Sequence, residues 1–210
     1  MPMVGLITTL EDPGPPPGRS PWVDGALPSR DVRVVDPDPA WPHRFEELRA
    51  RILAALGPRV LQLDHVGSTS VPGLAAKPII DIDLIVAAPD DELSYVPALR
   101  AAGFTLRLRE PWWWEHRMLR ASDPDCNLHV FGPDSPVPWR DRIFRDHLAR
   151  TPSDLDLYVM AKLAAARESA AAGLHTMEYN QLKQDVIVAI TRRAFEEAGL
   201  LRGAPVSALG

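Results

Sequence analysis

The chain has 210 residues, 46% hydrophobic and 24% charged, which is ordinary for a globular protein that buries a sizeable core. Its net charge of −5 and its scattered basic residues argue against a nucleic-acid surface, since such surfaces usually carry a basic stripe. The single cysteine, Cys126, excludes an internal disulfide, and no apolar run approaches membrane-spanning length. We therefore expect a cytoplasmic protein without nucleic-acid or membrane partners.

The first segment, residues 1–30, is rich in proline and glycine and has little apolar periodicity. This composition predicts a flexible, partly polyproline arm. Two interpretations remain open for it: a poorly ordered terminus, or a proline-rich ligand for a partner protein.

Regular structure is predicted from Val32 onward. Phe45, Leu48 and Ile52 recur at helical spacing and predict a helix that begins near residue 38 and stops at Gly57. Strands are predicted at residues 60–66, 79–86, 104–109, 114–120 and 127–131. A turn is predicted at 67–77 and a second helix over 90–103. These elements indicate a small mixed β-sheet with flanking helices.

Everything after residue 138 has a helical pattern, with helices predicted at 140–150, 153–172 and 175–198. The predicted fold class is therefore α+β. We divide the chain into an arm (1–30), an α/β core (31–136), a C-terminal helical region packed on the core (137–199) and a tail (200–210).

Two carboxylates interrupt the apolar strand at residues 79–86. Because strand side chains alternate between faces, Asp81 and Asp83 point the same way. Removing an ionised carboxylate from water costs several kcal/mol unless it is paired, so two of them predict a divalent cation such as Mg²⁺. The alternative is an edge strand whose polar face is simply solvated.

Just upstream, the segment Gly67-Ser68-Thr69-Ser70 follows a predicted strand. A glycine, hydroxyl groups and free backbone N–H groups together form a corner that can bind phosphate. A phosphate corner next to a metal-binding carboxylate pair is what chemistry on a nucleoside triphosphate needs. The alternative is a polar turn with a capping serine.

Apolar-Gly-Ser, twelve residues and Asp-apolar-Asp-apolar resemble the signature of the DNA polymerase β-like nucleotidyltransferase superfamily. More specifically, HVGSTSVPGLAAKPIIDIDLIV resembles the core motif of the GrpB family, also called UPF0157. The likeness extends to DPDPAWPHRFEEL, REPWWWEHRML, NLHVFG, FRDHLAR, YVMAKLAAAR and YNQLKQDVIVAI, and so covers about residues 32–198. It implies a nucleotidyltransferase-like α+β core with NTP and Mg²⁺ as ligands, ATP being the expected nucleotide.

The resemblance also implies roles for particular residues. Gly67 and Ser68 take the phosphate corner, with Ser70 as helper, and Asp81 and Asp83 take the metal and catalytic role. Active members of the superfamily carry a third carboxylate on an adjacent strand, where this chain has His129. Three readings of His129 stay open: a general base, a phosphate contact, or a structural histidine.

Further candidates for nucleotide or phosphate binding lie outside these motifs. All but Arg117 have a plainer alternative: an ion pair with Asp146 for the arginine of FRDHL, a solvated loop position for the lysine at 77, and a core tyrosine with a surface lysine in the last helix. The candidates are Lys77, Arg117, Arg145, Tyr179 and Lys183.

Together these features predict a Mg²⁺-dependent nucleotidyltransferase. It would transfer NMP from an NTP to a small-molecule acceptor, or activate a carboxylate by adenylylation as a ligase does. The alternative from another class is a non-catalytic nucleotide or metabolite sensor, in which the phosphate corner remains but the third carboxylate has been lost to His129.

Overall fold

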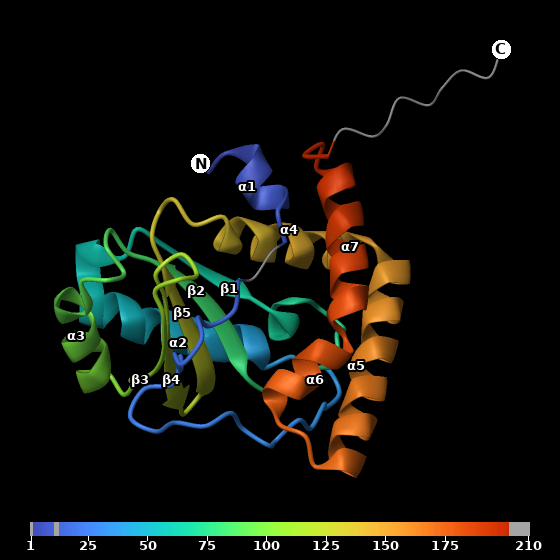
Figure 1. The fold of residues 1–210 in the computed structure, drawn as a ribbon, viewed down its shortest axis with the longest axis horizontal. Helices are drawn as coiled ribbons and strands as arrows, with labels where there is room; N and C mark the ends of the chain where they lie inside the picture. The colour runs from blue at the N-terminus through green and yellow to red at the C-terminus, as the bar shows by residue number, and fades with distance from the viewer. Residues whose placement is uncertain (1, 11–12, 202–210) are drawn as a thin grey trace.

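The computed structural model describes residues 2–10 and 13–201 (Figure 1). A short helix α1 (Val4–Thr8) precedes α2 (Trp41–Leu56), β1 (Gln62–Val66), β2 (Ile80–Ile85) and α3 (Val96–Ala101). There follow β3 (Thr105–Glu110), β4 (His116–Ser122), β5 (Asp125–Phe131), α4 (Val137–Arg150), α5 (Pro152–Ala172), α6 (Thr176–Leu182) and α7 (Gln184–Glu197). Three 3₁₀ turns, η1 (Gly57–Arg59), η2 (Ser68–Ser70) and η3 (Glu92–Ser94), complete the described elements.

The five strands form one mixed sheet in the order β1-β2-β5-β4-β3. The central pair β2–β5 is parallel, and the other neighbours are antiparallel. This arrangement confirms the α+β class. It also places β2, with its two aspartates, between β1 and β5 rather than at an edge, so the solvated-edge alternative does not hold.

The hydrophobic core lies on one face of the sheet. Ile80, Ile82 and Leu84 alternate with the aspartates on β2, and all three are fully buried against α2 and α3. Strand β5 adds Leu128 and Val130 to the same face. The 2-residue period of the strands thus sends the apolar side chains to one face and leaves the polar side chains on the other.

The helical region covers the polar face. Helix α4 contacts β1 and α7, and Figure 1 shows α5, α6 and α7 grouped beside the sheet. The imidazole of His147 on α4 joins three helices, because its two nitrogens lie 2.6 Å from carboxylate oxygens of Asp154 on α5 and Glu197 on α7. These contacts hold α4, α5 and α7 together on the polar face of the sheet.

Two predictions about the ends of the chain need correction. The arm does not extend freely: Ile7 is fully buried, and the guanidinium of Arg140 donates to the carbonyls of Leu6 and Ile7 at 2.6 and 2.9 Å. The predicted helix 175–198 is two helices, because Lys183 leaves the helical conformation with φ −111° and ψ 2°. Residues 202–210 of the predicted tail and residues 11–12 of the arm lie outside the described residues. Within the described ranges, every helix is too short or too polar to cross a bilayer.

Candidate active site

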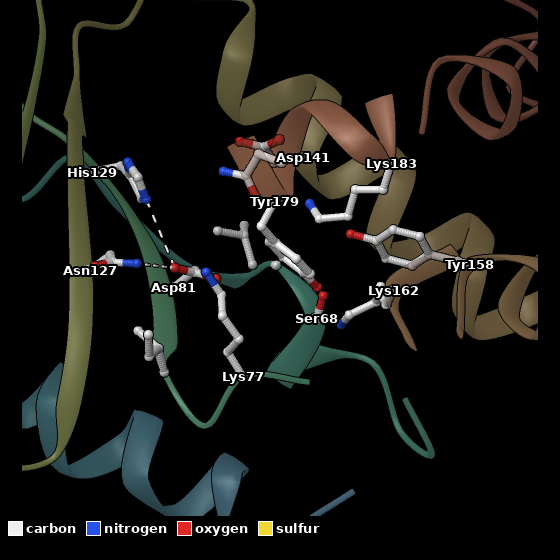
Figure 2. Close-up of a pocket in the computed structure, with 14 residues that line it drawn as sticks. Ser68, Lys77, Asp81, Asn127, His129, Asp141, Tyr158, Lys162, Tyr179 and Lys183 are labelled. Atoms are coloured by element: carbon white, nitrogen blue, oxygen red, sulfur yellow. Dashed lines mark hydrogen bonds and ion pairs between the residues drawn. The ribbon is translucent and has the colours of Figure 1, made fainter. Parts of the chain in front are cut away.

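A cavity of about 320 Å³ opens on the polar face of the sheet, between β2, β5 and the helices α4, α5 and α6 (Figure 2). Carboxylates reach it from Asp81 on β2 and Asp141 on α4, and amines reach it from the loop before β2 and from the helical region. The residues that line it are Val66, Gly67, Ser68, Lys77, Ile79, Asp81, Asn127, His129, Asp141, Tyr158, Lys162, Tyr179, Asn180 and Lys183.

Gly67 brings the serine-rich turn against Asp81. Its φ of 65° and ψ of −167° belong to a region that only glycine adopts readily. A Cβ at this position would lie 2.5 Å from Oδ2 of Asp81, far inside contact distance. The glycine is therefore required by the close approach of the two segments, and it places Ser68 and Asp81 on one wall.

Strand β5 supplies the next residues of that wall. The amide of Asn127 donates to Oδ1 of Asp81 at 2.8 Å, and Nε2 of His129 lies 4.0 Å from the same oxygen. In the parallel pairing, Asp81 stands opposite Asn127 and Asp83 opposite His129. The position beside the carboxylates on β5 thus holds an imidazole, as the sequence predicts.

His129 is the cavity end of a chain of polar side chains. Its Nδ1 lies 3.0 Å from Nε2 of His116, whose Nδ1 lies 2.7 Å from Oε2 of Glu110. Burial, and then the neighbouring His116, lower the pKa of His129 to about 4. The imidazole is therefore neutral at pH 7 and can accept a proton from a bound group.

The tryptophan-rich loop between β3 and β4 supports this chain from behind. Trp113 packs edge-on against the rings of His116 and Phe131, with centroids 5.1 and 5.8 Å apart. The next two residues, Trp114 and Glu115, have φ values of 56° and 53°, which are uncommon for residues other than glycine. The loop thus holds the His116 ring in place without lining the cavity itself.

Asp83 lies deeper than Asp81 and is only 1% exposed. No N–H or O–H group of the described residues donates to either of its carboxylate oxygens. Burial raises its pKa, and the negative charges of Asp141, Asp64 and Asp81 raise it further. Burial likewise raises the pKa of Asp141 on α4. Two buried carboxyl groups in contact can share a proton or a cation, but they cannot satisfy each other as two anions.

These carboxylates fit Mg²⁺ as shared donors rather than as a complete cage. Among the described residues, no group of three or more His, Cys, Asp or Glu side chains is arranged to hold a metal ion. Mg²⁺, however, is usually held by one or two carboxylates together with substrate phosphates and water. Asp81, with Asp83 and Asp141 next to it, offers such a partial set of oxygen donors.

The opposite side of the cavity carries positive charge. Nζ of Lys77 and Nζ of Lys183 lie 5.2 and 5.0 Å from the centre of the Tyr179 ring, and Nζ of Lys162 lies 5.2 Å from that of Tyr158. Burial, and then the neighbouring lysines, lower the pKa of Lys162 to about 7 and that of Lys183 to about 8. This wall is therefore rich in donors that can take up an anion.

Four predicted site residues do not line the cavity. The hydroxyl of Ser70 donates to the carbonyl of Gly67 at 2.6 Å and closes the turn. Nε of Arg117 lies 2.7 Å from Oε1 of Glu92, because Arg117 follows His116 on the strand and so faces the other side of the sheet.

Arg145 forms the ion pair with Asp146 that the sequence offers as its alternative role. Its Nε lies 2.7 Å from Oδ1 of Asp146, and it also donates to the carbonyl of His65 at 2.9 Å. Asp83, buried behind the lining, is the other predicted residue that does not reach the cavity surface.

Sequence reasoning did not assign site roles to several lining residues. Asp141, Tyr158 and Asn180 come from helices whose local pattern says nothing of which face meets the sheet. Asn127 and Lys162 gave a usable signal: one shares a strand face with His129, and the other is a lysine inside an otherwise apolar helical stretch.

Comparison with known proteins decides the family. The GrpB protein family model matches residues 31–193. The chain belongs to the GrpB family. A UPF0157 protein of Halalkalibacterium halodurans is 44% identical over 163 residues, which are 78% of this chain and 82% of that protein. A UPF0157 protein of Streptomyces coelicolor is 40% identical over 78% of this chain and 84% of its own length.

A solved structure shares the fold. The crystal structure of conserved protein GrpB from Enterococcus faecalis matches with a TM-score of 0.67 and 26% identity, covering 80% of this chain and 99% of that one. Part of a protein named dephospho-CoA kinase from Mycolicibacterium paratuberculosis is also similar. It is 41% identical over 120 residues, which are 53% of this chain and 27% of that protein. GrpB-like segments thus also occur inside longer proteins.

Proposed function

We propose that this GrpB protein is a Mg²⁺-dependent nucleotidyltransferase that transfers a nucleoside monophosphate from an NTP, with ATP as the expected nucleotide, to a small-molecule acceptor. One observation carries the proposal: a single cavity is lined by both carboxylate acceptors and ammonium donors. A cation bound to a chain of phosphates is complementary to both kinds of group at once.

The residues at the cavity would bind the metal ion and the phosphates separately. Asp81, with Asp83 and Asp141, would hold Mg²⁺, which when bound withdraws charge from the phosphate oxygens. The turn at Gly67 and Ser68, with Lys77 and the lysines of the helical wall, would bind and orient the phosphates.

In the reaction, an acceptor oxygen or nitrogen forms a bond to the α-phosphorus as the bond to pyrophosphate breaks. His129, neutral and within reach of Asp81, takes the proton that a hydroxyl or amine acceptor gives up. A carboxylate acceptor has no such proton to lose, and its product would be an acyl nucleotide of the kind that ligases use. The similarity of this chain to part of a dephospho-CoA kinase supports a small-metabolite acceptor.

A second candidate function is nucleotide or metabolite sensing without turnover. It is favoured by one observation: the β5 position next to Asp83 holds His129 rather than a third carboxylate.

The two functions are separated by supplying the protein and Mg²⁺ with each of the four α-labelled NTPs and a metabolite extract. Transfer predicts label in a new species, lost in Asp81→Asn and kept in the control Asp156→Asn, whose side chain is exposed on α5. Tight NTP binding without any labelled product in the wild-type protein would instead identify a sensor.

A further inference from the structure

All the lysines of this protein lie in one cavity. The sequence contains 3 lysines and 20 arginines. Lys77, Lys162 and Lys183 all line the cavity, and none of its lining residues is arginine. An ammonium is a compact point charge that can lose its proton when buried, whereas a guanidinium stays charged and planar. A chain that otherwise uses arginine for its cations therefore uses a different cation at this one place.

Two donors of this wall have no acceptor within the described part of the chain. Nζ of Lys162 is one of them, and the residue is 2% exposed. The hydroxyl of Tyr179, 1% exposed, is the other. Buried donors are nearly always satisfied, and leaving one unpaired costs about 1–3 kcal/mol. Both residues line the cavity, so the missing acceptor is one that a ligand can bring.

The donors are spread across the wall. The amines of Lys77 and Lys183 lie on either side of Tyr179 in Figure 2, each about 5 Å from the centre of its ring. Lys162 projects from α5 toward the same space, below the ring and near Ser68. Several linked phosphates match this spread of donors better than a single phosphate does. The Tyr179 ring is buried between two amines, so it is not free to stack a nucleobase.

We infer that the part of the cavity around Tyr179 is a polyphosphate site, in which the three lysines and the Tyr179 hydroxyl bind the linked phosphates of the ligand. The inference rests on the proposed function in taking those phosphates to be the outer ones of an NTP. It goes further in one respect: the site recognises the phosphate chain itself, so free tripolyphosphate or pyrophosphate binds without a nucleoside. The carboxylates of Asp81 and Asp141 line the same cavity, so Mg²⁺ strengthens this binding without being required for it.

The lysine distribution gives a direct test on the unmodified full-length protein. Reductive methylation labels lysine amines and the N-terminal amine, and peptide mass spectrometry reports each separately. With tripolyphosphate present and EDTA excluding metals, the three lysines should be methylated several-fold more slowly, and the N-terminal amine should react at an unchanged rate. Equal labelling of the lysines with and without tripolyphosphate overturns the inference.

Calorimetry then tests individual residues. Tripolyphosphate should bind more tightly than pyrophosphate, and pyrophosphate more tightly than phosphate. Lys162→Met, which removes the amine but keeps an unbranched apolar side chain, should weaken tripolyphosphate binding at least tenfold, and Tyr179→Phe should weaken it several-fold. Arg167→Met removes one positive charge from the exposed face of the same helix and should change the affinity less than twofold. An unchanged affinity in Lys162→Met counts against the site.

Failure of this inference is distinct from failure of the proposed transfer. Labelled products formed from an NTP, together with lysines that tripolyphosphate does not protect, would leave the transfer standing and reject the polyphosphate site. Protection by tripolyphosphate, together with no labelled product from any NTP, would leave the site standing and reject the transfer.

Discussion

Replacing Gly67 by alanine tests how the cavity is built. The backbone at this position costs a residue with a side chain about 1–3 kcal/mol, since φ is 65° and ψ is −167°. The new Cβ would also lie 2.5 Å from Oδ2 and 2.9 Å from Cβ of Asp81. Relieving such overpacking typically costs a further 1–3 kcal/mol or so. We therefore expect Gly67→Ala to lose about 2–6 kcal/mol of unfolding free energy.

Gly57→Ala is the matched control. Its φ of 55° and ψ of −128° are also unfavourable for alanine, but a Cβ there meets no atom within 4 Å. It should lose only the backbone cost of about 1–3 kcal/mol.

Urea unfolding followed by circular dichroism compares the two variants. Calorimetry with Mg²⁺ and a nonhydrolysable ATP analogue should show weaker binding only for Gly67→Ala, because only that variant displaces the Asp81 carboxylate. Equal losses of stability in both variants, or undiminished analogue binding in Gly67→Ala, would refute this account of the corner.

The remaining predictions concern charge. Because the pKa of Lys162 is lowered to about 7, the amine is mostly neutral at pH 8.5 and must take up a proton to bind an anion. Tripolyphosphate should thus bind about tenfold more weakly at pH 8.5 than at pH 6.5 by calorimetry, and a dependence of the same size in Lys162→Met would contradict this. Arg117→Met should lower the unfolding free energy by about 1.5 kcal/mol in urea, since Glu92 loses one charged donor but keeps its pairing with Arg109, yet tripolyphosphate affinity should not change. His147→Gln should cost about 2 kcal/mol in the same assay, because Asp154 loses a charge-assisted hydrogen bond between helices; an unaltered midpoint would show that this link is not stabilising.

The sheet side of the site could be predicted from the sequence because it depends on local rules. The alternation of Asp81 and Asp83 with isoleucine and leucine fixes which side chains share a face, and the same rule puts Asn127 and His129 together on β5. The resemblance to known motifs then predicts that the two strands are neighbours. The structure places them side by side, in parallel register.

The helix side could not be predicted, because it depends on contacts between distant segments. Asp141 lies 58 positions after Asp83 in the sequence, and only the packing of α4 across the sheet brings their carboxyl groups together. The break at Lys183 was missed because lysine and its neighbours are all acceptable in a helix. The residue type predicts a phosphate contact for Arg117, but strand alternation puts it on the face opposite His116, which the structure turns toward His129.

The contact between Asp83 and Asp141 affects the stability of the folded state. A fully buried carboxylate without a donor, that of Asp83, next to the second acid Asp141 opposes folding whenever nothing neutralises the pair. A cation or a proton that binds between them stabilises the native state relative to the unfolded state by mass action. The free energy of unfolding therefore rises with the concentration of the ligand that supplies that charge.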